Sequence, residues 1–236
     1  MIICGGDEAG RGALVGPLVV AVVAIKSTYS KKLSEIGVRD SKMLSPKKRE
    51  SLYGNIFDLA TEVKTDKILP YEINYAMKNN ISLNELEAMH FAKLINQIDS
   101  DISTIYVDSP DVIAPKFGIR IKIQSNKNIK VMGIKAKAEK GVKYIRMISE
   151  HKADSLYPVV SAASIIAKVT RDREIARIKK ITGIDFGSGY PSDYKTINAV
   201  RTNLNNKALS EHIREYWHTM EDIKQTNLFE YLKKQA

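Results

Sequence analysis

The sequence predicts an α/β core followed by a helical C-terminal segment. Runs rich in valine and isoleucine indicate strands near the N-terminus and around residue 105. Capping residues and apolar positions at helical spacing indicate helices between and after these runs. From residue 184 onward the pattern is helical and polar, with few strand signals. Strands mixed with helices are typical of a sheet covered by helices.

Two neighbouring strands are expected at the N-terminus. Met1–Cys4 is apolar, and the run LVGPLVVAVVAI at 14–25 is dense in β-branched residues after Pro17. Between them lies GGDEAGRG, residues 5–12, in which Asp7 and Glu8 are adjacent. Neighbouring residues of a regular strand point to opposite faces. We therefore expect the flanking glycines to turn the backbone here, so that both carboxylates can serve one site.

Two helices are expected in the first half of the chain. Ser45 and Pro46 resemble an N-cap with proline at the first helical position, and they predict a helix to about residue 60. Ser82 and Glu85 form a capping-box pattern, and apolar residues at helical spacing follow as far as Ile98.

The remainder of the predicted core combines two strands with one long helix. Residues 103–107 are typical of a short buried strand that ends at Asp108. Isoleucine alternates with charged residues at 119–123, which predicts a half-exposed strand. A long helix is expected from Pro158 to about residue 181, with Gly183 ending it.

The composition favours a polyanionic partner. The 236 residues carry a formal net charge of +10, which favours nucleic acid first and an anionic membrane surface second. Cys4 is the only cysteine, so no disulfide framework can form within one chain and a reducing compartment is expected. The longest apolar run, 12–25, is shorter than the roughly 18 residues of a membrane span. We therefore expect a cytoplasmic protein that does not enter a membrane.

Carboxylates mark the ends of several predicted elements. Asp7 and Glu8 follow the first strand, Asp108 ends another, and Asp154 lies just before the long helix. Strand ends meet at one edge of an α/β sheet, so these side chains can converge. Clustered carboxylates repel one another unless they share protons or bind divalent cations, and oxygen-only ligands select Mg²⁺ or Mn²⁺. A solvated turn is the simpler interpretation of the Asp-Glu pair alone.

One face of the predicted long helix suits the approach of a phosphate backbone. Four polar residues recur on it at spacings of three and four: Ser161, Ser164, Lys168 and Arg171. Alanines beside them allow close approach. Tight packing of an alanine-rich helix on the sheet explains the same pattern, and the sequence leaves both interpretations open.

The motifs together resemble ribonuclease HII, in particular its archaeal branch. In family order the chain has DEAGRG at 7–12, DSK at 40–42, YVDSP at 106–110, HKADSLYPVVSAASIIAKVTRDRE at 151–174 and GSGYPSD at 187–193. The pairing of DEAGRG with SAASIIAK is highly specific. Tyr194 departs from the archaeal pattern, which has proline there.

The resemblance implies a ribonuclease H-like three-layer α/β fold with a mixed five-stranded sheet, plus a C-terminal helical extension. The catalytic core would span residues 1–183 and the extension residues 184–236. The implied activity is metal-dependent endonucleolytic cleavage of the RNA strand of RNA/DNA hybrids, and of duplex DNA at single embedded ribonucleotides. The products would carry a 3′-hydroxyl and a 5′-phosphate, and the enzyme is expected to act as a monomer.

The resemblance also implies roles for individual residues. Four carboxylates would be both catalytic and metal-binding, with two divalent cations, Mg²⁺ or Mn²⁺: Asp7, Glu8, Asp108 and Asp154. Backbone groups of the GRG motif would contact the ribose 2′-hydroxyl, and Tyr190 would pack on the sugar at the RNA–DNA junction. The expected substrate-binding set is Gly10, Arg11, Gly12, Lys42, Ser161, Ser164, Lys168, Arg171 and Tyr190.

The tail contains QTNLFEYL, residues 225–232, which resembles the sliding-clamp-binding motif. The expected anchors are Gln225, Leu228, Tyr231 and Leu232. Such a segment inserts apolar anchors into a pocket of its partner. An ordinary amphipathic terminal helix is the alternative interpretation.

Two other functions compete with a hybrid-cleaving nuclease. A strand-transfer or junction-resolving nuclease shares the fold class, but DEAGRG argues against it. A non-catalytic nucleic-acid-binding module has no need of four carboxylates, which would repel DNA in the absence of metal.

Overall fold

The computed structural model describes residues 1–133 and 143–225. The chain divides into two compact units. The first unit contains residues 1–9, 19–67 and 84–170, and the second contains residues 10–18, 68–83 and the chain from 171 onward. The division of the chain at 183/184 into catalytic core and extension stays a prediction.

A mixed sheet forms the centre of the first unit, as predicted. In the described part of the chain it has six strands in the order β3-β2-β1-β4-β6-β5, one more than expected. The strands are β1 Ile2–Ala9, β2 Leu18–Lys26, β3 Glu62–Ile68, β4 Ile102–Asp108, β5 Ile129–Val131 and β6 Ile145–Glu150. Strand β1 is antiparallel to β2 and parallel to β4, while β6 is parallel to both β4 and β5.

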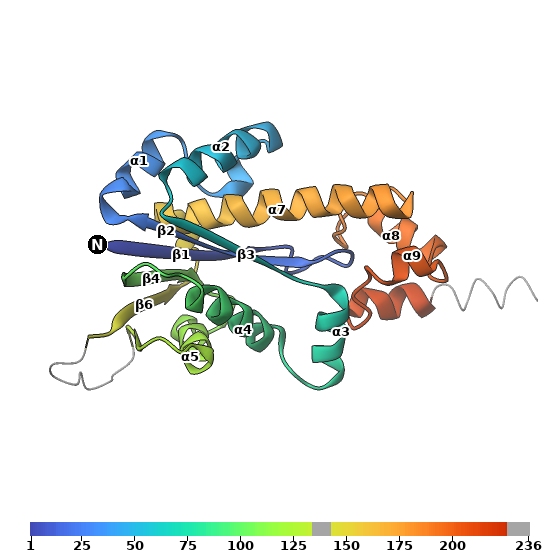
Figure 1. Ribbon diagram of the computed structural model, residues 1–236. Coiled ribbons are helices and arrows are strands. Elements are labelled where there is room, and N and C mark those ends of the chain that lie inside the picture. The colour runs from blue at the N-terminus through green and yellow to red at the C-terminus, as the bar shows by residue number, and fades with distance from the viewer. Residues whose placement is uncertain (134–142, 226–236) are drawn as a thin grey trace, which may run out of the picture. The chain divides into compact units, whose positions relative to one another are not determined.

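Helices cover both faces of this sheet. One side carries α1 Ser30–Glu35, α2 Pro46–Leu59 and the beginning of α7 Pro158–Thr182, and the other carries α4 Leu83–Asn96 and α5 Ala114–Gln124 (Figure 1). Short turns of helix lie at Ser27–Tyr29 (η1), Ser41–Met43 (η2) and Ala153–Leu156 (α6). The predicted three-layer arrangement is confirmed within this unit.

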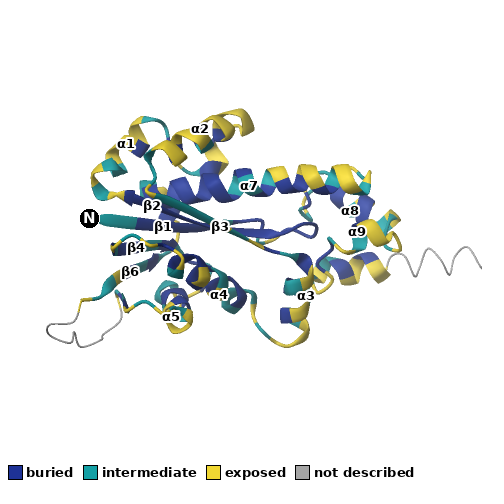
Figure 2. Ribbon diagram, in the orientation of Figure 1, coloured by how far each residue is buried: buried dark blue, intermediate teal, exposed yellow. Residues whose placement is uncertain are grey.

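The sheet is buried because both faces are covered. Every residue of β2 from Leu18 to Ile25 is fully buried, which explains a continuous apolar run rather than an alternating one (Figure 2). The first helix prediction is confirmed at its start, where the Ser45 hydroxyl accepts a hydrogen bond from the backbone N–H of Lys48. Gly183 follows α7 with φ +67°, as expected of a glycine that ends a helix.

Close contact between α7 and β1 fixes the depth of the helix on the sheet. A Cβ atom placed on Gly5 would lie 2.3 Å from the carbonyl carbon and oxygen of Val159. On the opposite face, a Cβ on Gly6 would lie 3.0 Å from the Phe91 ring and 3.1 Å from Val107. The two glycines before the Asp-Glu pair therefore serve packing on both faces of the strand.

Two predicted elements were wrong. Residues 119–123 lie in helix α5 rather than a strand, because Phe117, Gly118 and Ile121 are buried at helical spacing. A Cβ on Gly118 would lie 3.0 Å from Val131 and 3.4 Å from Met147, so α5 packs directly on β5 and β6. The other error concerns β1, which does not turn at the Asp-Glu pair but continues to Ala9.

The second unit is helical. It contains α3 Pro70–Lys78, α8 Tyr194–Thr202, α9 Lys207–Ser210, the end of α7 and helical residues 218–225. Its apolar core joins residues from distant parts of the chain, including Leu14, Val15, Ile178, Phe186 and Ile213. No helix in the described part of the chain is long and apolar enough to cross a membrane.

The Gly5 contact predicts a large effect from a single methyl group. We expect Gly5→Ala to destabilise the protein by about 3 kcal/mol, since the overlap is with backbone atoms that cannot rotate away. Thermal unfolding should show a Tm lower by roughly 6–12 °C. Gly54→Ala in α2 is the matched control, because no atom lies within 4 Å of its Cβ position and alanine favours a helix by about 0.5–1 kcal/mol. Equal Tm values for the two variants would contradict this account of the helix–strand contact.

Candidate functional site

Strand β1 holds the first two carboxylates in regular strand geometry. Asp7 pairs with Ala21 and Glu8 with Val20 of β2. Asp7 is buried and Glu8 is half-buried, and the Glu8 backbone N–H donates to Asp7 Oδ1 at 2.8 Å. The predicted turn begins only at Gly10, whose φ is +94°. The Asp-Glu pair is therefore part of a hydrogen-bonded strand rather than of a solvated loop.

Parallel pairing brings the third carboxylate beside the first. Gly6 of β1 pairs with Val107 of β4, so the next residues along the two strands, Asp7 and Asp108, lie side by side. Asp108 also pairs with Glu150 of β6. The strand register alone thus places three carboxylates in one row across the sheet.

A tight turn brings Asp154 to the same place. Asp108 Oδ1 accepts a hydrogen bond of 2.7 Å from the backbone N–H of Ala153, the first residue of α6. Lys152 precedes it with φ +57°, an uncommon conformation for a residue with a side chain. The Ser161 hydroxyl of α7 donates to the Asp154 carbonyl. Asp154 is itself buried, and its turn is tied to β4 through the Ala153 N–H and to α7 through the Asp154 carbonyl.

Burial and like charges raise the pKa values of two of these groups. Burial raises the pKa of Asp7 well above its ordinary value, and the charges of Glu8 and Asp108 add to the effect. Burial likewise raises the pKa of Asp108, with a further contribution from Asp154. The Ala153 N–H, Lys42 and His151 partly oppose this shift in Asp108.

Lys42 supplies a positive charge near these carboxylates. It lies in η2, between Asp40 and α2. Burial alone would lower the pKa of Lys42, but Asp154, Asp40, Asp7 and Asp108 together raise it above its ordinary value. Lys42 therefore stays protonated at neutral pH and lies within the field of three of the predicted catalytic carboxylates.

The carboxylate oxygens suit a hard divalent cation whose remaining coordination positions are filled by water and substrate. Within residues 1–133 and 143–225, no group of three or more His, Cys, Asp or Glu side chains is arranged to hold a metal ion. Mg²⁺ usually keeps several waters and binds through one or two carboxylates together with substrate phosphates. Buried carboxylates raise one another's pKa values here, and a bound divalent cation would favour their ionised forms.

The predicted substrate residues on the first part of α7 have internal partners. Ser161 and Ser164 are buried, and the Ser164 hydroxyl lies 2.9 Å from that of Ser41. Lys168 is half-buried. The helix face proposed for a phosphate backbone thus includes Ser164, which ties α7 to the Lys42 turn, residues 41–44. Contact of these residues with substrate stays a prediction.

The second unit gathers the remaining predicted residues around a buried arginine. The Arg171 guanidinium is 1% exposed, lies 4.5 Å from the centre of the Tyr190 ring and donates to the Ser188 carbonyl at 3.2 Å. A Cβ on Gly10 would lie 2.4 Å from Arg171 Nε, so only glycine fits there. The Gly189 carbonyl accepts hydrogen bonds from the N–H groups of Leu14 and Val15.

A second buried arginine, which the sequence did not indicate, holds the GRG motif from the other side. Arg214 donates to the Gly16 carbonyl from Nε and Nη2, at 3.1 and 3.0 Å, and to the Arg11 carbonyl from Nη1, at 2.8 Å. Its side chain is fully buried. Gly12 has an open environment and is exposed. Arg214 thus restrains the chain at the Arg11 carbonyl, within the GRG motif, and at the Gly16 carbonyl that follows it.

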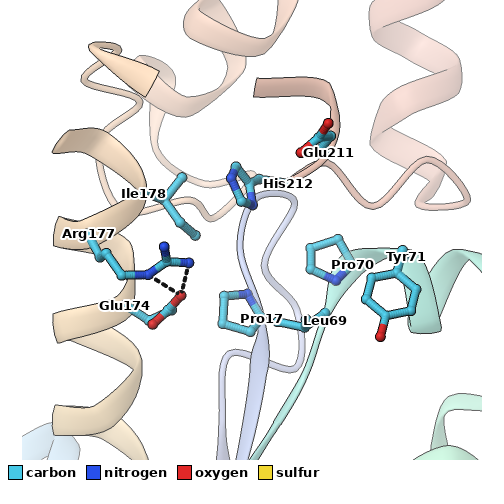
Figure 3. Close-up of a pocket in the computed structure, with 9 residues that line it drawn as sticks. All are labelled: Pro17, Leu69, Pro70, Tyr71, Glu174, Arg177, Ile178, Glu211 and His212. Atoms are coloured by element: carbon cyan, nitrogen blue, oxygen red, sulfur yellow. Dashed lines mark hydrogen bonds and ion pairs between the residues drawn. The ribbon is translucent and has the colours of Figure 1, made fainter. Parts of the chain in front are cut away.

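A pocket of about 370 Å³ in the second unit contains none of the predicted residues. Figure 3 shows its lining, which is Pro17, Leu69, Pro70, Tyr71, Glu174, Arg177, Ile178, Glu211 and His212. Glu174 accepts two hydrogen bonds from Arg177 at one wall. The predicted clamp anchors Leu228, Tyr231 and Leu232 lie outside the described residues, and Gln225 ends the described helix.

Comparisons with known proteins agree with these features. The family model of ribonuclease HII matches residues 4–220. Ribonuclease HII of Cenarchaeum symbiosum is 41% identical over 218 residues, which cover 92% of this chain and 95% of that protein. The crystal structure of ribonuclease H2 from Pyrococcus horikoshii OT3 has a TM-score of 0.78 at 37% identity, covering 96% of this chain and 99% of the other. The PCNA:RNase HII complex from Archaeoglobus fulgidus has a TM-score of 0.76 at 35% identity, covering 92% and 95%.

The raised carboxyl pKa values predict that the site costs stability when no cation is bound. We expect Asp7→Asn to raise the Tm at pH 8 in EDTA. As the pH rises above the ordinary carboxyl pKa of about 4, the unfolded chain loses its Asp7 proton before the folded chain does, so the wild type loses stability. The amide cannot ionise, so its advantage should vanish below about pH 4 and grow as the pH rises.

Thermal unfolding of both proteins between pH 3.5 and 8 in about 1 mM EDTA measures this difference. Asp185→Asn is the control of opposite sign, because ion pairs with Lys179 and Lys195 lower the pKa of Asp185. A metal-free Asp7→Asn variant that melts below the wild type at pH 8 would show that the carboxylate is not a source of instability.

Proposed function

Because the chain belongs to the ribonuclease HII family, and is thus an endonuclease acting on the RNA of RNA/DNA hybrids, we propose that it also cleaves duplex DNA at single embedded ribonucleotides. The proposed products carry a 3′-hydroxyl and a 5′-phosphate. Enzymes of this family use divalent metal ions, and we propose two, Mg²⁺ or Mn²⁺, at the carboxylates of the first unit.

One observation carries the proposal: carboxylates from three separate segments meet in one place. Asp7 and Asp108 are neighbours through the parallel pairing of β1 and β4, and Asp108 accepts from the turn that carries Asp154. The charge of Asp108 contributes to the raised pKa of Asp7, and the charge of Asp154 contributes to that of Asp108, which supports the proposal. A non-catalytic binding module would have no use for such an arrangement, because it repels a phosphate backbone.

Each side chain has a distinct proposed task. Asp7, Glu8, Asp108 and Asp154 would hold the cations through oxygen ligands. When bound, such ions activate water and stabilise the leaving oxygen of a phosphodiester. Lys42, protonated among these carboxylates, would offer a positive charge to the scissile phosphate. The hydrogen bond from Ala153 to Asp108 would keep that carboxylate oriented during turnover.

Recognition of RNA is proposed to come from the GRG motif and Tyr190. The 2′-hydroxyl distinguishes a ribonucleotide from a deoxyribonucleotide. In the loop of Gly10, Arg11 and Gly12, the Arg11 carbonyl accepts a hydrogen bond from the buried Arg214, so the backbone there is restrained before substrate arrives. Tyr190 is half-buried and stacked on Arg171, which limits the motion of its ring. Such preorganised polar groups favour a substrate with a hydroxyl over one without.

A sliding clamp is the proposed protein partner. The ribonuclease HII of Archaeoglobus fulgidus has been solved in complex with PCNA. The corresponding anchors in this chain would be Gln225, Leu228, Tyr231 and Leu232. The proposal rests on the motif and on that relative.

Cleavage of matched duplexes tests the proposed activity. The substrates are an RNA/DNA hybrid, a DNA duplex with one ribonucleotide, and the same duplex entirely of DNA, each with Mg²⁺ or EDTA. We expect cleavage of the first two only, and only with the metal. Asp7→Asn and Asp108→Asn should each lower turnover by more than tenfold while the protein stays folded, because a lost ligand charge weakens metal binding. Cleavage of all-DNA duplex, or more than a tenth of wild-type turnover in both variants, would overturn the proposal.

Tyr190 variants test recognition of the junction. Tyr190→Ala should reduce cleavage at a single ribonucleotide more than cleavage of a long hybrid, where other contacts help to place the scissile phosphate. Tyr190→Phe should fall between, because it keeps the stack on Arg171 but loses the hydrogen bond that we propose between the Tyr190 hydroxyl and the ribose 2′-hydroxyl, worth about 1 kcal/mol. Cleavage rates of both substrates by the three proteins decide the question. Equal losses on both substrates would leave Tyr190 as a packing residue of its loop.

Deletion of residues 225–236 tests the clamp motif. The truncated protein should cleave short duplexes at the wild-type rate but lose affinity for the clamp, since Leu228, Tyr231 and Leu232 would be the anchors. Clamp affinity is measured by titration with the purified clamp of the same organism. A full-length protein with only Arg201→Ala, a change outside the tail, serves as the control. Undiminished binding after truncation would mean that the tail is not the clamp-binding segment.

A further inference from the structure

Helix α2 contains a buried arginine where an apolar residue is expected. Arg49, Leu52 and Ile56 are the buried residues of this helix and follow one another at spacings of three and four. Arg49 is only 8% exposed. A guanidinium loses much of its hydration in such a position, so its hydrogen bonds must compensate for the lost contacts with water.

The hydrogen bonds of Arg49 close the turn that carries Lys42. Nη1 donates to the Ser41 carbonyl at 3.1 Å and to the Leu44 carbonyl at 2.6 Å. These two carbonyls flank Lys42 and Met43, which are both exposed. The Arg49 guanidinium thus holds the backbone at both ends of η2, while the side chains of Lys42 and Met43 stay exposed on the surface.

Two further hydrogen bonds fix the same turn. Asp40 Oδ1 accepts from the backbone N–H of Lys42 at 2.9 Å. The Ser41 hydroxyl lies 2.9 Å from the Ser164 hydroxyl of α7, and Ser164 in turn interacts with Asp7. The backbone at Lys42 is therefore restrained from α2, from its own turn and from the helix that packs on β1.

The turn that the buried Arg49 holds carries Lys42, whose charge lies near the predicted catalytic carboxylates. Lys42 is the exposed residue of the turn that lies within the field of Asp154, Asp40, Asp7 and Asp108. A long lysine side chain contributes to a reaction only if its backbone is placed, because each free rotor lowers the fraction of time in the useful position. Leucine at position 49 would fill the helix face but leave the Ser41 and Leu44 carbonyls without this donor.

We infer that Arg49 is a positioning residue for hydrolysis, which acts by holding the Ser41–Leu44 turn so that Lys42 faces the carboxylates of the first unit. The inference rests on the proposed function. Arg49 does not touch the substrate, and it acts through Lys42. Loss of Arg49 should therefore lower turnover because Lys42 is no longer positioned. Once Lys42 has been removed, loss of Arg49 should have no further effect on turnover.

A double-mutant cycle tests this route. The proteins are wild type, Lys42→Ala, Arg49→Met and the double variant, with kcat and KM measured on an RNA/DNA hybrid and Tm measured in parallel. We expect Arg49→Met to lower kcat by about tenfold or more, since small displacements of a positioned group have effects of that size. The double variant should match Lys42→Ala within about twofold, because residues that act as one unit are not additive.

Lys47→Met is the matched control, because it removes an exposed cation from the same helix and should leave kcat within about twofold of wild type. Arg49→Lys should retain part of the activity, since an ammonium can still donate to a carbonyl. It also replaces Arg49→Met in the cycle if the methionine variant does not fold. If the wild type does not cleave the hybrid, the proposed function has failed. If the wild type is active but the double variant loses kcat by the product of the two single losses, Arg49 does not act through Lys42. Unchanged kcat with a lowered Tm would show that Arg49 is structural only.

Discussion

The parallel pairing of β1 with β4 is the constraint on which the site depends. It places Asp7 beside Asp108 without any contribution from the side chains themselves. Gly5 then allows α7 to lie against β1 at a distance that no other residue would permit. The helix brings Ser161 and Ser164 with it, and through them the Asp154 turn and the Lys42 turn. Strand register and one close helix contact thus assemble groups that are distant in sequence.

The assembled carboxylates oppose the stability of the fold that holds them. Burial and mutual repulsion raise the pKa values of Asp7 and Asp108, so each ionised group costs free energy in the folded state. The remainder of the first unit compensates, with β2 buried along its length and helices on both faces. A bound cation would relieve the same repulsion, so metal binding and stability are linked at this site.

Buried arginines hold three of the loops to which a function is proposed. Arg49 holds the Lys42 turn, Arg171 holds the Ser188 carbonyl and the Tyr190 ring, and Arg214 holds the GRG loop. In each case the guanidinium donates to backbone carbonyls. Its several N–H groups in a rigid plane can bridge carbonyls that no single apolar side chain would order. The loops themselves can then present glycine, lysine or tyrosine outward.

Residue patterns alone indicated the carboxylates that the structure brings together, and most of the elements that carry them. The β-branched run of β2, the Ser45-Pro46 start of α2 and the end of α7 at Gly183 follow from local preferences that the tertiary contacts do not override. Tertiary structure decided the rest, because burial and strand pairing outweigh local propensity. Residues 119–123 are helical because Phe117 and Ile121 are buried at helical spacing in α5, and because Gly118 packs on β5 and β6. Pro115, in the first turn of α5, is a local feature of the sequence that indicates the start of this helix. The Asp-Glu pair stayed in a strand because Asp7 and Glu8 pair with Ala21 and Val20 of β2, and a short segment of sequence does not show which strand lies beside it.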